Sequence, residues 1–161
     1  MNSSRSFAQL NLPAADLNLR RSKQGTTEVF DPLRSKWVAM TPEENVRQHF
    51  VNFLITGLGY PAGRIGNEIS LELNGTARRC DTVVYDSQGK PVMLVEYKAP
   101  GISITRAVFE QILRYALVLD TKWLVVSNGL RHFCARAVKE PEPGLSFVSQ
   151  IPGYDDLSTG Y

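Results

Sequence analysis

The stretch that decides the fold reads Arg78-Arg79-Cys80-Asp81-Thr82-Val83-Val84-Tyr85 and, after a turn, Met93-Leu94-Val95-Glu96-Tyr97-Lys98. The two apolar runs predict neighbouring strands, and the polar, glycine-containing segment between them predicts the turn of a hairpin. Asp81 lies at the start of the first strand, whereas Glu96 and Lys98 lie at the end of the second. Because buried charges are costly without partners, charged residues at these positions indicate a functional site.

The elements around this hairpin follow from apolar periodicity and from Pro, Gly and Asn signals. Thr41 is a typical N-cap and Pro42 a typical first helical residue, so a helix is predicted from about 41 to 58. We expect a second helix at 105–119 and further strands at 17–21, 27–30, 68–73, 122–127, 131–138 and 145–151. The order predicts an α/β protein with a mixed central β-sheet flanked by helices. It divides into an N-terminal extension with short strands (1–40), a core (41–140), and a C-terminal edge strand and tail (141–161).

The composition is that of an ordinary globular domain. The chain has 161 residues, of which 43% are hydrophobic and 21% charged, and this is enough for one domain with a core. A net charge of +2 does not by itself indicate a polyanion partner. Cys80 and Cys134 have no metal-ligand or disulfide spacing and are expected to be buried apolar residues. No segment has the length and hydropathy of a membrane span or a signal core, so we expect a cytoplasmic protein with no membrane partner.

Two carboxylates and a lysine are expected to meet at one edge of the sheet. Glu96 and Lys98 are two residues apart and therefore share one face of their strand, and the hairpin can bring Asp81 opposite Glu96. Carboxylate oxygens suit Mg²⁺, for which Mn²⁺ can substitute. Lys98 can orient or deprotonate a water, or stabilise the charge on a phosphate. The alternative is a surface cross-strand ion pair between Lys98 and an acid.

Two residues of the first predicted helix have both structural and functional interpretations. Glu44 fits a capping box, in which its carboxylate bonds the N-cap amide, but it can also project toward a metal, with Glu43 as the competing acid. Arg47 lies one turn further along the helix. It can contact phosphate or form an ion pair with Glu43 or Glu44.

Further candidates lie on the second helix and on surface arginines. Gln111 is expected on a helix face shared with Tyr115, from which it could reach the site, although a partly exposed glutamine is the plainer interpretation. Arginines could line a nucleic-acid groove, namely Arg78, Arg79, Arg106, Arg114 and Arg131, although scattered arginines are also typical of a solvated surface.

Taken together, these segments resemble the PD-(D/E)XK nuclease superfamily. They resemble most closely the N-terminal nuclease domain of the type I restriction enzyme R subunit, in its short stand-alone form. The resemblance covers roughly residues 35 to 135 in order. Its segments are Trp37 to Gln48, Arg79 to Tyr85, Val95 to Pro100, Gln111 to Tyr115, and Ser127-Asn128-Gly129. Cys80 stands where the name-giving proline would be, and the sequence has no Gly-x-x-x-x-Gly-Lys-Ser/Thr phosphate loop.

The resemblance implies a restriction-endonuclease-like fold and a Mg²⁺-dependent endonuclease that hydrolyses DNA. It makes Asp81 and Glu96 the metal ligands and Lys98 the catalytic lysine, with Gln111 and Glu44 as further catalytic residues. Expected substrate contacts are Arg47, Arg79, Arg106 and Tyr115. A homodimer or a larger restriction-type assembly is the expected quaternary state. The alternative function is a non-cutting nucleic-acid-binding or assembly module that retains the nuclease fold.

Overall fold

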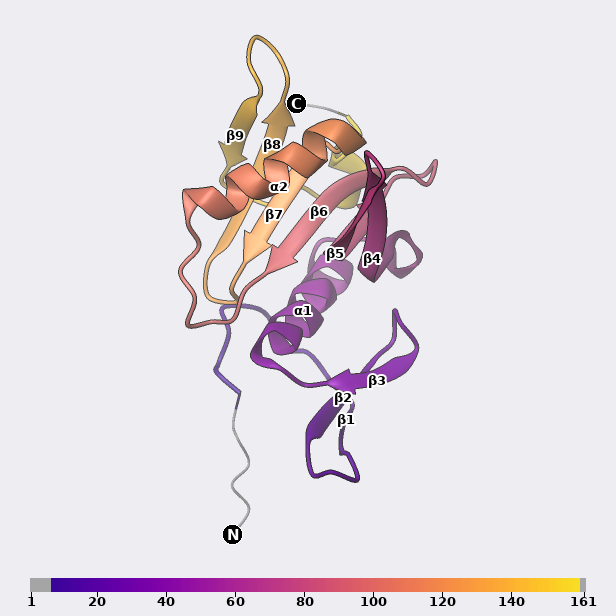
Figure 1. The fold of residues 1–161 in the computed structure, drawn as a ribbon. Helices are drawn as coiled ribbons and strands as arrows, with labels where there is room; N and C mark the ends of the chain where they lie inside the picture. Colours follow the sequence, from indigo (N-terminus) through magenta and orange to yellow (C-terminus); the bar gives the residue numbers. More distant parts are fainter. Residues whose placement is uncertain (1–6, 160–161) are drawn as a thin grey trace.

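The computed structural model describes residues 7–159, except for the side chains of Leu73 and Thr76. Residues 1–6 of the expected N-terminal extension and residues 160–161 of the expected tail lie outside the described residues. The described chain forms a six-stranded sheet, a three-stranded sheet and two α-helices (Figure 1).

The large sheet contains the predicted hairpin at its centre. Its strands are β4 (Ile65–Leu73), β5 (Thr76–Tyr85), β6 (Pro91–Tyr97), β7 (Trp123–Ser127), β8 (His132–Val138) and β9 (Gly144–Val148), in that spatial order. All neighbours are antiparallel except β6 and β7, which are parallel and joined through α2 (Arg106–Leu119). A parallel pair needs such a crossover, because a tight turn can only reverse the chain. The predicted mixed sheet is therefore confirmed.

The turn between β4 and β5 forms as its sequence indicates. Asn74 and Gly75 have φ values of +49° and +78°. Asn-Gly is favoured at the two central positions of a hairpin turn that needs positive φ at both. This turn pairs β4 with β5 over nearly their full lengths.

One helix covers each face of the large sheet (Figure 1). α1 (Pro42–Asn52) continues as a π-helical turn (Phe53–Gly57), so the helical segment ends close to the predicted residue 58. Its residues Val46, Phe50 and Leu54 are fully buried against β6 and β7 residues. On the other face, α2 packs Phe109, Ile112 and Ala116 against a second cluster. The hairpin that carries Asp81 and Glu96 is thus part of a sheet that lies between the two helices.

The N-terminal segment forms a small antiparallel sheet of its own. Its strands are β1 (Leu19–Arg21), β2 (Thr27–Asp31) and β3 (Lys36–Ala39), in that order. The segment around Trp37, for which no strand was predicted, is therefore the third strand of this sheet. β3 leads directly into α1, so the small sheet lies beside the start of that helix (Figure 1).

The remaining regular elements are short. Single 3₁₀ turns occur at Ala62–Arg64 and Tyr154–Asp156. Cys80 and Cys134 are buried free thiols, as expected. None of the helices in the described residues is long and apolar enough to cross a membrane.

Candidate active site

Asp81 and Glu96 occupy facing positions on β5 and β6. The ladder between these strands pairs Thr82 with Val95, and Asp81 and Glu96 are the next residues along it. The Asp81 carboxylate is anchored, because its Oδ2 accepts a hydrogen bond from the backbone N–H of Tyr97 at 2.8 Å. The Asp81 charge is one of the causes that raise the Glu96 pKa, so the two carboxylates lie near one another.

The side chains of β6 alternate as its sequence indicates. Val95 and Tyr97 pack into the core beneath α1, whereas Leu94 packs into the core beneath α2. Glu96 lies on the α2 side, where it shares a small cavity with Ile112 of that helix. Glu96 therefore lies on the face of β6 opposite to Val95 and Tyr97.

The charge of Asp81 affects the ionisation of Glu96. Burial, together with the nearby Asp81 carboxylate, raises the pKa of Glu96 to about 7, against the opposing effects of Arg78 and Lys98. Burial also raises the pKa of Asp81, against the Tyr97 N–H and the charge of Arg47. Close, desolvated like charges resist ionisation unless a cation compensates them. The pair is thus suited to a positive partner.

Lys98 follows the last residue of β6 and begins the loop that leads toward α2. Its backbone N–H donates to the Ser127 carbonyl oxygen at 2.9 Å. The Asn128 side chain donates to the carbonyl oxygen of Ile102 at 2.8 Å and accepts from the N–H of Arg131 at 2.8 Å. The Ser-Asn-Gly segment therefore fixes the loop that carries Lys98.

Arg78 lies beside Glu96 and is stacked on α2. Its Nη2 is 4.0 Å from Glu96 Oε2, and its guanidinium carbon lies 4.0 Å from the centre of the Tyr115 ring. The Nη1 atom is buried without a hydrogen-bond partner among the described residues. Tyr115 thus reaches the site through Arg78, while its expected contact with substrate stays a prediction.

Arg47 connects three elements behind the site. Its Nη1 donates to the Asp81 carbonyl oxygen at 3.2 Å, and its Nη2 donates to Glu68 Oε1 at 2.5 Å. Its Nε lies 3.3 Å from Glu44 Oε2, so the ion pair expected as one alternative is present. Only 6% of Arg47 is exposed. Arg47 therefore holds the backbone of Asp81 in place. The contact of Arg47 with phosphate stays a prediction.

Glu44 has a different structural role from that expected of a capping box. Thr41 Oγ1 accepts from the Glu44 N–H at 3.0 Å, which confirms the N-cap. The Glu44 carboxylate, however, accepts from Arg34 Nη2 at 2.5 Å and from Gln48 Nε2 at 3.1 Å. The Thr41 N–H donates to Ala39 instead. The capping-box alternative is therefore wrong, because buried cations compete for the carboxylate. A catalytic role for Glu44 stays a prediction.

A chain of buried hydrogen bonds ties the small sheet to the site hairpin. Asp31, at the end of β2, accepts from Arg34 and from Asn67 Nδ2, the latter at 3.0 Å. Thr82 Oγ1 donates to Asn67 Oδ1 at 2.7 Å and accepts from the Tyr97 hydroxyl at 2.9 Å. Buried polar networks that are satisfied in this way rigidify a core. The strands that carry Asp81 and Glu96 are thus held from the α1 side.

The other predicted site residues lie on the surface. Gln111 is exposed on α2, and no side-chain hydrogen bond links it to the described site residues. The Arg79 side chain is 69% exposed and lies 3.5 Å from Glu68. The Arg106 side chain is 92% exposed and pairs with Glu110 at 3.4 Å. The structure does not gather these three residues around the carboxylates, and their roles stay predictions.

Several residues of the site were not predicted from sequence. Glu68 has a φ of +55°, which is rare for a non-glycine residue and can mark strain at a functional position. It lies opposite Asp81, between the pairs Asn67–Thr82 and Ile69–Cys80. No sequence signal marks Glu68, Asp31 or Arg34, since each is one charged residue among many in a polar segment.

The oxygen atoms of the site suit a hard divalent cation that takes most of its ligands from waters and substrate rather than from the protein. Among the described residues, no cluster of three or more His, Cys, Asp or Glu side chains is arranged to hold a metal. Asp81 Oδ1 and the Glu96 carboxylate remain as oxygen donors beside Lys98. Mg²⁺ is commonly bound by one or two carboxylates plus waters and substrate phosphates.

The mixed sheet between two helices, with Asp81 in the middle of β5 rather than at its expected start, Glu96 near the end of β6 and Lys98 just after it, is that of a restriction-endonuclease-like nuclease of the PD-(D/E)XK class. The family model described as type I restriction enzyme R protein N terminus (HSDR_N) matches residues 42–152. The chain therefore belongs to this family.

A solved structure with a similar fold comes from Anabaena variabilis and is described as a candidate nuclease belonging to DUF820. It is 13% identical in sequence and has a TM-score of 0.46, over 86% of this chain and 87% of that one. Among curated proteins, no significant match to the chain is found.

Proposed function

We propose that this nuclease domain is a Mg²⁺-dependent endonuclease that hydrolyses DNA phosphodiesters at Asp81, Glu96 and Lys98. The observation that supports the proposal best is the neighbouring pair of half-buried carboxylates, in which Asp81 contributes to raising the pKa of Glu96 to about 7. Such a pair is costly in a fold unless a cation uses it. Membership of the type I restriction enzyme R family supports DNA as the substrate.

Each residue has a separate task in this proposal. Asp81 and Glu96 would hold Mg²⁺, or Mn²⁺ in its place, and the ion would lower the pKa of a water and neutralise phosphate charge. The Tyr97 N–H and Arg47 keep Asp81 in place. Lys98 would orient the attacking water, or bind the charge that develops on the phosphate.

A non-cutting nucleic-acid-binding or assembly module is the second candidate. One observation favours it: the Glu44 carboxylate is hydrogen-bonded by Arg34 and Gln48 and is therefore not free to bind a metal. An active enzyme needs only Asp81, Glu96 and Lys98 in the proposal above, so a cleavage assay separates the two candidates.

The test is cleavage of supercoiled plasmid and of single-stranded DNA with Mg²⁺, with Mn²⁺ and with chelator. We expect metal-dependent nicking by the wild type, and a loss of roughly 10²–10⁴-fold in rate for Lys98→Ala, which is the usual contribution of a proton-transfer group. Lys122→Ala is the control, because Lys122 is exposed next to β7. An unchanged melting temperature for both variants excludes unfolding as the cause.

If the wild type leaves every substrate intact in both metals but still binds DNA, the non-cutting module becomes the better account. A cytoplasmic location and a homodimer or larger restriction-type assembly belong to the same proposal. Sedimentation of the purified chain with and without DNA tests the assembly.

A further inference from the structure

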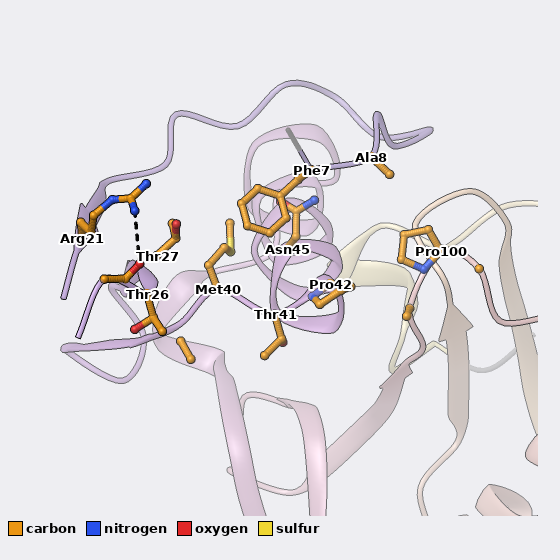
Figure 2. A pocket seen from close by; sticks show the side chains of 14 residues that line it. Phe7, Ala8, Arg21, Thr26, Thr27, Met40, Thr41, Pro42, Asn45 and Pro100 are labelled. Carbon is orange, nitrogen blue, oxygen red and sulfur yellow. Dashed lines mark hydrogen bonds between the residues drawn. The ribbon is translucent and has the colours of Figure 1, made fainter. Parts of the chain in front are cut away.

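A groove of about 1150 Å³ runs beside the candidate active site. It lies between the small sheet, the first turn of α1 and the loop that follows Lys98. Figure 2 shows Arg21 toward one end and Pro100 toward the other, with Met40 and Asn45 between them. Typical small-molecule sites enclose about 300–1,000 Å³, so a groove of this size suits an extended ligand.

The charge of the groove favours an anion. Among the described residues, Arg21 is the charged residue of its lining, and no Asp or Glu lines it. One Arg21 donor, Nη1, is bound to the Gly25 carbonyl oxygen at 3.3 Å. Arginine has five N–H donors in a planar fork that matches phosphate, so Arg21 keeps donors for a ligand.

The groove wall also carries a polar side chain. Asn45 lines the groove from α1 and is 4% exposed. A carboxamide both donates and accepts, so it can bond a sugar, a phosphate or a base edge.

The groove is continuous with the catalytic loop. Ala99, Pro100 and Gly101 line it and follow Lys98 directly in the chain. The loop is anchored by the Asn128 side chain at Ile102. From this loop to Arg21, the described lining of the groove contains no Asp or Glu.

We propose that this groove binds the sugar–phosphate backbone of the nucleic-acid strand that flanks the cut, with Arg21 as a phosphate contact. The inference rests on the proposed function and adds the small N-terminal sheet to the substrate-binding surface. The proposal requires a basic residue on the face of β1 that lines the groove.

Arg20 and Arg21 form a matched pair for the test. They are adjacent on β1 and so project to opposite faces. Arg20 stacks on Trp37 at 4.3 Å and pairs with Glu28 at 2.9 Å, away from the groove lining. Binding of a fluorescent single-stranded oligonucleotide and of a duplex is measured over a range of salt, in a Lys98→Ala background with Mg²⁺.

We expect Arg21→Ala to weaken binding roughly five- to tenfold near 0.1 M salt and to lower the salt slope by about one, as for one lost phosphate contact. Arg20→Ala should leave the slope unchanged. Equal effects of the two variants, or no effect of either, would overturn the groove assignment even where the wild type cuts DNA.

A second pair tests the groove by adding charge rather than removing it. A Cβ atom at Gly101 or at Gly63 would meet no atom within 4 Å, and neither glycine has a positive φ. Gly101→Glu places an acid in the groove and should weaken binding several-fold, whereas Gly63→Glu places one elsewhere on the surface and should not.

The two proposals fail in different ways. If the wild type neither binds nor cuts nucleic acid at low salt, the proposed function fails, and the groove assignment fails with it. If the wild type cuts but Gly101→Glu binds as well as Gly63→Glu, the groove assignment alone is overturned. A groove that takes only a protein partner would give this second result.

Discussion

The protein holds Asp81 and Glu96 in different ways. Asp81 is fixed by the Tyr97 N–H at 2.8 Å, and its carbonyl oxygen is bound by Arg47. Glu96 has a looser partner, since Arg78 Nη2 lies 4.0 Å from its carboxylate. At the scale of the residue, Asp81 is therefore held more firmly than Glu96.

Removal of either carboxylate should weaken metal binding strongly. We expect Asp81→Asn and Glu96→Gln each to lower Mn²⁺ affinity by at least the roughly 10–100-fold typical of altered metal sites. Glu72→Gln, at an exposed position of β4, should bind like the wild type. The affinity is measured by titration with Mn²⁺, monitored through its electron paramagnetic resonance signal. Anomalous density for Mn²⁺ away from the Asp81–Glu96 pair would contradict the assignment.

At the scale of the element, the small sheet depends on one buried carboxylate. Asp31 is fully buried and accepts hydrogen bonds from Asn67 on β4, from Arg34 and from the Leu33 N–H. Burial alone would raise the pKa of Asp31, but the Asn67, Arg34 and Leu33 donors outweigh it and lower the pKa below its ordinary value. The ionised form is therefore the one that joins the two sheets.

The stability of the protein should fall in acid for this reason. A lowered pKa stabilises the fold above the ordinary aspartate value of about 3.9, and this contribution is lost as the pH falls through the folded pKa. We expect Asp31→Asn to cost about 3–5 kcal/mol at neutral pH, as for a broken buried pair, and to flatten the decline in stability below about pH 4.

Urea unfolding between pH 7 and pH 3 measures both effects. Asp16→Asn is the control, because Asp16 is exposed in the segment before β1. If Asp31→Asn keeps the full acid sensitivity of the wild type, other carboxylates carry it.

At the scale of the whole molecule, the exposed arginines of the described residues are scattered and form no element that could read bases. Arg21 lines the groove and Arg79 is exposed near Glu68. Neither α-helix projects from the fold, because each packs on a face of the large sheet (Figure 1). This arrangement suits phosphate contacts more than contacts with base edges.

DNA binding should therefore be weak, sensitive to salt and nearly independent of sequence. Phosphate contacts release counterions, so affinity should fall steeply as salt rises. Two unrelated duplexes and one single strand, titrated at two salt concentrations, measure both properties. Discrimination between the duplexes by about 1–3 kcal/mol would instead indicate base-edge contacts.

The sequence by itself determined the elements and their approximate bounds. Thr41 and Pro42 start α1, and Asn74-Gly75 forms a hairpin turn, because capping and positive φ are local properties of the chain. The facing of Asp81 and Glu96 also follows from one hairpin and its period of two. These features involve residues close in sequence, so local chemistry is sufficient to predict them.

Only the tertiary structure decided which partners the charged residues take. Arg47 bonds Asp81 and Asn67 bonds Asp31, across 34 and 36 positions of the chain. The Glu44 carboxylate bonds Arg34 rather than making the expected capping bond, since a buried carboxylate is stabilised most by a nearby cation. The groove likewise requires that the β1–β2 hairpin, α1 and the loop after Lys98 come together. Such contacts depend on how the layers pack, which periodicity and spacing do not specify.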